Sequence, residues 1–437
     1  MTYFDALAYA EHLLGEVGTA CSVTGLHDHP ALGWRRAGLM GLTGYPGDKA
    51  LVCPIALTSA ADGALMALKA LVDEPENLPR NGAVLLGERG RLFNFHRLGR
   101  VSANGGSRLL DTSDGRLALT LARSEDWDAL PALLERDQCA DWDAVTTALL
   151  STKTNRIVGR GIELGLAVAA DRRLPAPVRL FDPMPRAGTR HTGTPLVVDL
   201  SGLWAGPLAG SLLALAGAHV IKVESTTRPD AARHGNQSFY DLLNGGKSSV
   251  ALNFSDARGV QSLDRLLNRA EIVIEASRPR ALEQLGIDRS AIIDKGAVWV
   301  TITAHGAVGN AASRIGFGDD AGVAAGLSTI MAESWGRPMF VGDAIADPLT
   351  GIHAAFGAWA GWLSGRGQLI QLSLSNTIAY VIGKGASGLQ ELLPRWQSIA
   401  EADREPLYDS RVPRCAARPF GADTTQIVAT YCAGGAG

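Results

Sequence analysis

The sequence predicts an α/β fold in which a Rossmann-like parallel sheet with covering helices is joined to a smaller α+β domain. From Leu196 to Gly306, apolar runs of strand length alternate with helix-like segments, a pattern typical of a parallel sheet between helices. Residues 108–175 instead combine a strand-like run with several helix-like segments. The chain has 437 residues, 46% of them hydrophobic, which suggests about two or three domains with sizeable cores.

The net charge and the cysteine content indicate which partners and which redox environment to expect. The net charge is −3, so bulk charge gives no reason to expect nucleic acid or a membrane surface. No apolar run reaches membrane-spanning length, and the N-terminus carries acidic residues early, unlike a secretory signal. The five cysteines are scattered without a paired motif, which favours reduced thiols. We therefore expect a cytoplasmic protein.

Residues 1–107 form the first predicted segment. Helical spacing marks residues 3–15 and 58–71, and the segment ends near the turn Asn104-Gly105-Gly106. The pairs Ala37-Gly38 and Ala325-Gly326 precede similar small-residue helices at the same distance, which leaves an internal repeat open. His27 and His29 have no third ligand nearby, so we expect no metal site.

Residues 108–175 are predicted as the small α+β domain. A strand starts at Gly115, and Ser124 caps a helix that runs to Leu134. Two further helices follow, over residues 141–150 and 155–164. Residues 176–195 are rich in proline and are predicted as a linker.

Residues 196–437 are predicted as the Rossmann-like part with a C-terminal tail. Ligands of such sheets bind beyond the carboxyl ends of the strands. That rule places Leu203–Pro207, Glu224–Thr227, Arg278 and His305-Gly306 along one edge. No glycine fingerprint for a dinucleotide, no P-loop and no nucleophile-elbow motif is present in the sequence.

The stretch VGDAIADPLTG places Asp347 directly before Pro348 and an apolar, alanine-rich run. Asp is a favoured N-cap and Pro suits the first helical turn, so a helix over residues 348–364 is expected with Asp347 as its cap. A helix N-terminus favours an ionised carboxylate, and such a group in an apolar site is a potential nucleophile. A plain cap is the alternative. Lys247 and Arg278 are candidate anion-binding cations, each of which could equally be a solvated charge.

The run PLVVDLSGLWAGPLAGSLLALAGAHVIKVE resembles the N-terminal signature of the family III CoA-transferases, which include formyl-CoA and carnitine CoA-transferases and α-methylacyl-CoA racemases. The resemblance continues to about residue 380. It implies the family's fold and coenzyme A as substrate, with no tightly bound cofactor. It also implies a homodimer. Further similar motifs are LNGGKSSVALNF, AEIVIEASRPRALEQLGI, VWVTITAHG, GDAIADPLTGIHAAFGA and GQLIQLSL.

The resemblance also implies site residues. Asp347 matches the catalytic aspartate, and the glycine-rich loop that holds oxyanions is placed at Gly105 and Gly106. The expected CoA-binding residues are Leu203, Trp204, Ala205, Gly206, Pro207, Lys247 and Arg278. In the implied mechanism the carboxylate attacks an acyl-CoA thioester, forming an aspartyl anhydride and then an aspartyl-CoA thioester. A carboxylic acid acceptor finally takes the CoA.

Two departures from the family pattern keep alternatives open. The block 108–175 resembles the family's small domain yet precedes the Rossmann-like part, as if residues 1–107 were a partial first copy. The racemases place a histidine beside an aspartate near the turn at Gly316, where this chain has Gly318-Asp319-Asp320. A racemase or isomerase with Asp347 as base, and an inactive CoA-binding scaffold, are therefore the alternatives to a transferase.

Overall fold

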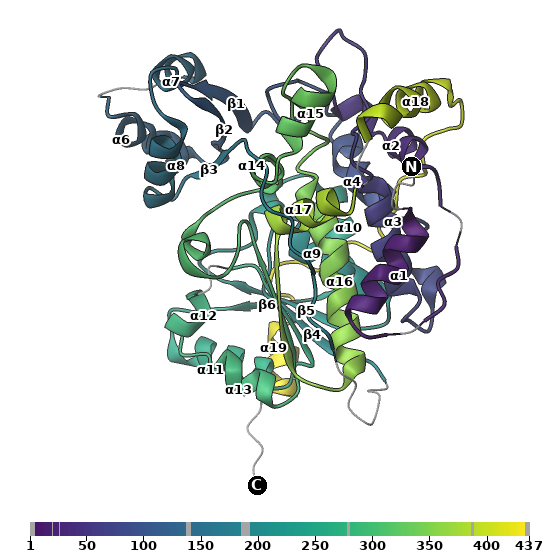
Figure 1. Ribbon diagram of the computed structural model, residues 1–437. Coiled ribbons are helices and arrows are strands. Elements are labelled where there is room, and N and C mark those ends of the chain that lie inside the picture. The colour runs from purple at the N-terminus through teal and green to yellow at the C-terminus, as the bar shows by residue number, and fades with distance from the viewer. Residues whose placement is uncertain are drawn as a thin grey trace.

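A six-stranded parallel sheet forms the centre of the molecule (Figure 1). In the computed structural model the described residues are 5–19, 21–25, 27–136, 141–184, 193–277, 280–385 and 389–432. The strand order is β6-β5-β4-β7-β8-β9, which confirms the predicted α/β class. The strands are β4 (Leu196–Asp199), β5 (His219–Ser225), β6 (Ser248–Leu252), β7 (Ile272–Glu275), β8 (Val298–Thr303) and β9 (Gln368–Ser373).

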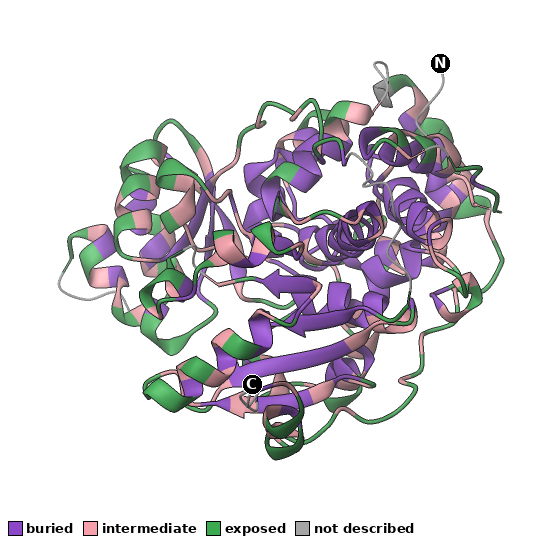
Figure 2. Cartoon of the chain, turned by 90° about the horizontal axis from the view of Figure 1, so that it is seen from below, coloured by how far each residue is buried: buried purple, intermediate pink, exposed green. Residues whose placement is uncertain are grey.

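Alternate residues of the strands enter two different cores, because successive side chains of a strand point to opposite faces. Val197 packs with helices α9 (Ala205–Leu215) and α16 (Ala346–Ser364). Val198 packs on the opposite face. Figure 2 shows the sheet buried between these two layers. The opposite face is covered by α11 (Ala257–Leu267), α12 (Ala281–Gln284), α13 (Arg289–Asp294) and α19 (Thr424–Tyr431).

The N-terminal helices extend the larger core on the side of α16 (Figure 1). Gly63 packs against Ala6, in the first turn of α1 (Ala6–Glu16). Gly351 packs in the same way against Ala205, in the first turn of α9. The likeness is one of packing, and the internal repeat stays a prediction. These helices are α1 (Ala6–Glu16), α2 (Pro30–Arg36), α3 (Leu57–Lys69) and α4 (Ala83–Leu92).

A three-stranded antiparallel sheet forms the smaller α+β unit. It docks on α14 (Gly318–Ala324) through an apolar cluster that includes Leu109 and Val323. The small unit is therefore seated on the helix that follows the Gly316 turn. Its elements are β1 (Ser107–Thr112), β2 (Gly115–Thr120), α5 (Ser124–Asp128), α6 (Leu130–Leu134), α7 (Trp142–Leu149), α8 (Thr154–Glu163) and β3 (Ala167–Ala170).

Several predicted helix boundaries were wrong. The helix from Ser124 is two short helices, and its cap is Arg123. The small-residue segment that follows Val323 is interrupted at Gly326, whose left-handed φ of 102° separates α14 from α15 (Leu327–Trp335). Helices α17 (Leu374–Lys384) and α18 (Leu389–Ala402) follow β9. Helices α4 and α10 (Gln237–Asn244) were not predicted.

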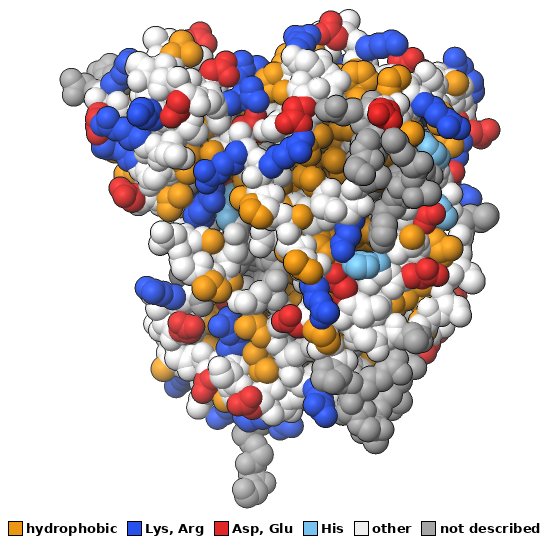
Figure 3. All heavy atoms as spheres, in the orientation of Figure 1, with side chains coloured by type: hydrophobic (Ala, Val, Ile, Leu, Met, Phe, Trp, Pro, Cys, Tyr) orange, Lys and Arg blue, Asp and Glu red, His pale blue; other side chains and the backbone are white. Residues whose placement is uncertain are grey.

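Charges of both signs are interspersed over the face seen in Figure 3, so no single-sign patch dominates it. Among the described helices, none combines the length and the apolarity that a membrane crossing needs.

Candidate active site

Asp347 lies in the first turn of α16, which begins one residue earlier at Ala346. The prediction that Asp347 is the N-cap was wrong, because Ile345 holds that position. Ala344, with a positive φ of 42°, forms the turn before the helix, and its carbonyl accepts the Asp347 N–H at 2.9 Å. The carboxylate is therefore not used as a cap and faces the neighbouring α14.

The Asp347 carboxylate accepts a hydrogen bond from the Gly318 N–H at the start of α14. Burial raises the pKa of Asp347 to about 7, although Arg89 and the Gly318 N–H lower it. Asp320 and Asp343 add to the increase. Because the residue as a whole is only partly buried, the site combines a desolvated carboxylate with access from outside.

Asp319, the second residue of α14, connects the turn at Ala344 to the glycine-rich turn Asn104-Gly105-Gly106. Its Oδ1 accepts the Ala344 N–H at 2.9 Å, and its Oδ2 accepts Asn104 Nδ2–H at 3.1 Å. Burial raises the pKa of Asp319 to about 7. The turn at Gly105 is thus held one hydrogen bond away from the helix start that contacts Asp347.

The N–H groups of that turn are already used within it. Gly105 N–H donates to the Ser102 carbonyl, and Gly106 N–H donates to Asn104 Oδ1, each at 2.8 Å. In this arrangement neither group points to an oxyanion. Their predicted role therefore requires the turn to rearrange.

Arg89 of α4 brings the positive charge of the site. Its Nε and Nη2 donate to Asp343 Oδ2 and Oδ1 at 2.7 and 2.6 Å, and Asp343 is completely buried. Its guanidinium also lies over the Trp204 ring, 4.6 Å from the centroid. This residue was missed by sequence reasoning, because nothing near Arg89 distinguishes it from other arginines.

The predicted CoA-binding stretch after β4 divides into an exposed and a buried part. Leu203 is 46% exposed and has a positive φ of 67°, which is uncommon for a residue other than glycine. Trp204 is buried, and Ala205, Gly206 and Pro207 form the buried first turn of α9. Leu203 is therefore the member of this stretch most open to a ligand.

Lys247 is enclosed in the core instead of facing a ligand. Its Nζ donates to Asp199 Oδ2 and the Pro207 carbonyl at 2.8 Å each, and to Asn244 Oδ1 at 3.1 Å. These bonds use all three donors of an ammonium group. Burial lowers the pKa of Lys247 to about 8, against the effect of Asp199. The arrangement favours a structural role. Arg278, the other predicted cation, lies outside the described residues.

A buried histidine lies beside the Gly316 turn. His305, from the end of β8, is 8% exposed, and its Nε2 is 3.4 Å from Asp320 Oδ2. Neither ring nitrogen of His305 has a hydrogen-bond partner among the described residues. Sequence reasoning placed His305 at the sheet edge but did not pair it with Asp320. Only the packing of α14 against the end of β8 joins them.

His353 and His29 make hydrogen-bonding contacts within the fold. His353 Nδ1 lies 2.7 Å from the Leu349 carbonyl and its Nε2 lies 2.9 Å from the Tyr9 hydroxyl. His29 Nδ1 accepts the Ala31 N–H at the start of α2. Within the described ranges, no group of three or more His, Cys, Asp or Glu side chains is arranged to hold a metal ion.

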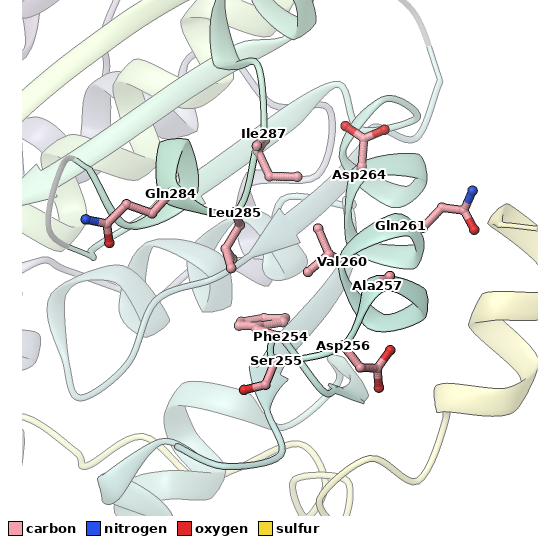
Figure 4. Close-up of a pocket in the computed structure, with 11 residues that line it drawn as sticks. Phe254, Ser255, Asp256, Ala257, Val260, Gln261, Asp264, Gln284, Leu285 and Ile287 are labelled. Carbon is pink, nitrogen blue, oxygen red and sulfur yellow. The ribbon is translucent and has the colours of Figure 1, made fainter.

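A surface pocket of about 510 Å³ lies beyond the carboxyl end of β6 (Figure 4). Phe254, Val260, Leu285 and Ile287 point toward one another across it. Polar side chains, among them Asp256, lie around these apolar groups. An apolar floor at this edge of a parallel sheet suits a flat ring of a nucleotide-containing ligand.

Comparison with known proteins finds a family similarity over part of the chain. Residues 195–395 match the model of CoA-transferase family III. A succinate–glutarate CoA-transferase of Agrobacterium fabrum is 29% identical over 205 residues, which are 43% of this chain and 51% of that protein. A formyl-CoA:oxalate CoA-transferase of Escherichia coli O6:H1 is 28% identical over 211 residues, 42% and 47% of the two chains. The chain spans about half the length of the curated relatives it matches.

Two solved structures are also similar to this chain. A hypothetical protein of Mycobacterium tuberculosis is 28% identical with a TM-score of 0.39, over 44% of this chain and 57% of that one. A CAIB/BAIF family protein of Brucella suis is 25% identical with a TM-score of 0.36, over 43% and 54%. The family match contains Asp347, Trp204 and His305, whereas Arg89 and Asn104 lie outside it.

Proposed function

We propose that this protein is an enzyme that moves CoA from an acyl-CoA thioester to a carboxylic acid, with Asp347 as nucleophile. The observation that carries the proposal is the position of Asp347 within the family-matched segment. Its carboxylate is desolvated and oriented by the Gly318 N–H, while the residue as a whole is only partly buried. A carboxylate that attacks a carbonyl must be ionised, and the pKa near 7 leaves a large ionised fraction at neutral pH.

The proposed reaction balances without an external cofactor. The Asp347 carboxylate oxygen attacks the thioester carbonyl and CoA leaves as thiolate, giving a mixed anhydride. The thiolate then attacks the aspartyl carbonyl and releases the first acid, leaving an aspartyl-CoA thioester. The acceptor carboxylate repeats the two steps in reverse order, so free aspartate and a new acyl-CoA are formed.

The pocket at Phe254 is proposed as the place for the adenine ring of CoA, because it supplies an apolar floor at the ligand-binding edge of the sheet. Leu203 is proposed to contact the CoA chain, because it is the exposed member of the loop after β4. Gly105 and Gly106 stay predicted oxyanion donors, supported by the link from Asn104 to Asp319. A homodimer and a cytoplasmic location stay predictions, and light scattering tests the first.

The test is trapping of the covalent intermediate. The protein is incubated with succinyl-CoA and hydroxylamine, and the Asp347 peptide is examined by mass spectrometry for a hydroxamate. Glutarate and oxalate are the first acceptors to assay, following the names of the relatives. We expect the adduct in wild type and in Asp128→Asn, an exposed control carboxylate, and its loss in Asp347→Asn. Transfer activity that survives in Asp347→Asn would exclude the proposal.

One observation favours a second candidate, an acyl-CoA racemase or isomerase. The sequence offered no histidine at the Gly316 turn, but the fold places His305 there, beside Asp320. Asp347 and His305 would then remove and return the proton at the α-carbon of the acyl group. Deuterium incorporation at that carbon from D2O, lost in His305→Gln and without any hydroxamate, would select this reaction. Neither signal, across a broad acyl-CoA set, would favour a CoA-binding scaffold.

A further inference from the structure

Arg89 belongs to the N-terminal segment, outside the residues that match the family. It nevertheless contacts two parts of the site within that match. Its two-point ion pair holds Asp343, four residues before Asp347. Asp343 is completely buried, so this pair is the main compensation for its charge among the described residues.

The same guanidinium lies on the face of the Trp204 ring, in the loop that precedes α9. A cation over an indole face is attracted by the ring's negative face, and more strongly where both are desolvated. Trp204 is 2% exposed, and its ring also meets Phe239 edge-on. One side chain of α4 therefore joins the turn before Asp347 to the loop proposed to contact CoA.

Arg89 is also the cation that acts most strongly on Asp347, in an acidic surrounding. Asp319, Asp320 and Asp343 all lie close enough to Asp347 or Arg89 to affect their pKa values. Arg89 is the largest charge that lowers the pKa of Asp347. Without it, the charges that act on this carboxylate among the described residues are those of Asp320 and Asp343, which raise its pKa.

We infer that Arg89 is a positioning residue of the Asp347 site, contributed by the N-terminal segment, which ties the turn that presents Asp347 to the Trp204 loop. This inference rests on the proposed role of Asp347. It assigns the N-terminal segment a part in the chemistry, although that segment lies beyond the family match. Arg91, two residues along the same helix, donates to the Tyr408 carbonyl at 2.6 Å, the one hydrogen bond of its side chain in the described part of the chain, and provides a matched control.

The first experiment measures the Asp347 carboxyl directly and needs no enzymatic activity. In protein labelled with ¹³C at aspartate side-chain carboxyls, the Asp347 signal is assigned by its loss in Asp347→Asn. In Arg89→Met we expect its pKa to rise by about one unit or more, because an adjacent arginine lowers a carboxyl pKa by about 1–3 units. Arg89→Lys keeps the charge and should stay near wild type, as should Arg91→Gln.

The second experiment separates binding from chemistry. Arg89→Lys loses the planar contact with Trp204, so KM for the acyl-CoA should rise by about 3- to 30-fold while the pH profile of kcat stays in place. Arg89→Met should change both the KM for the acyl-CoA and the pH profile of kcat. If Arg89→Met does not fold, the double variant Arg89→Met/Asp343→Leu removes the buried pair together, and its KM should still rise.

An unchanged Asp347 pKa in Arg89→Met, together with a KM equal to that of Arg91→Gln, would overturn the inference and leave Arg89 a purely structural ion pair. Failure of the proposed function looks different. In that case Asp347→Asn would retain CoA transfer, while the NMR titration would still respond to Arg89.

Discussion

Replacing Asp347 by Asn should stabilise the protein in a pH-dependent way. The pKa of this carboxyl rises from its usual 3.8 to about 7 on folding. Each unit corresponds to about 1.4 kcal/mol, so the ionised carboxylate costs the folded state about 4 kcal/mol at most. Because the residue is partly open to water, we expect about 2–4 kcal/mol to be recovered.

The direction follows from which state binds the proton more tightly. The folded state does, so the contribution of Asp347 to wild-type stability is greatest below pH 4 and is lost as pH rises from about 4 to about 7. Asn does not titrate and keeps an acceptor for the Gly318 N–H. The advantage of Asp347→Asn should therefore grow by up to about 1.4 kcal/mol per pH unit in this window and level off above it.

Urea unfolding followed by circular dichroism at pH 4.5, 6, 7 and 8.5 measures this difference, with Asp128→Asn as the exposed control. The gain in unfolding free energy of Asp347→Asn should accompany complete loss of hydroxamate trapping, because a catalytic carboxylate is retained although it destabilises the fold. The reasoning is refuted if the difference between variant and wild type is the same at every pH, or if Asp347→Asn is the less stable protein at pH 8.5.

Three further outcomes follow from the site and its support. In wild type, kcat/KM for an acyl-CoA should rise about tenfold per pH unit below the Asp347 pKa of about 7 and flatten above it; a flat profile from pH 5 to 9 contradicts a titrating nucleophile. Gly318→Ala should reduce activity at least about tenfold, because its Cβ would overlap the Asp347 carboxylate, whereas Gly322→Ala on the same helix meets only a flexible leucine; equal activities would count against this contact. Lys247→Met should cost about 3–5 kcal/mol in unfolding free energy by leaving Asp199 buried without its partner, and a loss below about 1 kcal/mol in urea unfolding would contradict that pairing.

The parallel sheet could be predicted because its signal is local. The runs beginning at Leu196 and Ser248 are mostly apolar over a strand's length, and each is followed by a helix-like segment, whereas the helix after the run at His219 was not predicted. A strand that is buried on both faces needs such a continuous apolar run, so composition alone distinguishes these strands from exposed segments. The glycine at 326 shows the limit of local reading, since its left-handed backbone divides a segment whose composition reads as one helix.

The role of Asp347 as a helix cap was predicted wrongly for a physical reason. Asp before Pro is a common sequence for a helix start, but the competing partner of the carboxylate, the Gly318 N–H, lies 29 positions earlier in the chain. Ala344 adopts a left-handed backbone, which lets the helix begin earlier and turns Asp347 toward α14. The prediction for Lys247 failed for a similar reason. A lysine after two glycines is typical of an exposed turn, and its buried partner Asp199 lies far away in the sequence.

By itself the sequence determined the α/β class, the order of the strands along the chain and the carboxylate proposed as nucleophile. Only the tertiary structure decided what surrounds Asp347. Arg89 and its partner Asp343 are 254 positions apart, and Asn104 reaches Asp319 from 215 positions away. Strand and helix periodicity is set by neighbours within a few residues, whereas these contacts depend on how α4, the glycine turn and α14 pack. Packing therefore converted an ordinary Asp-Pro helix start into a desolvated carboxylate, faced by one arginine from outside the family-matched segment.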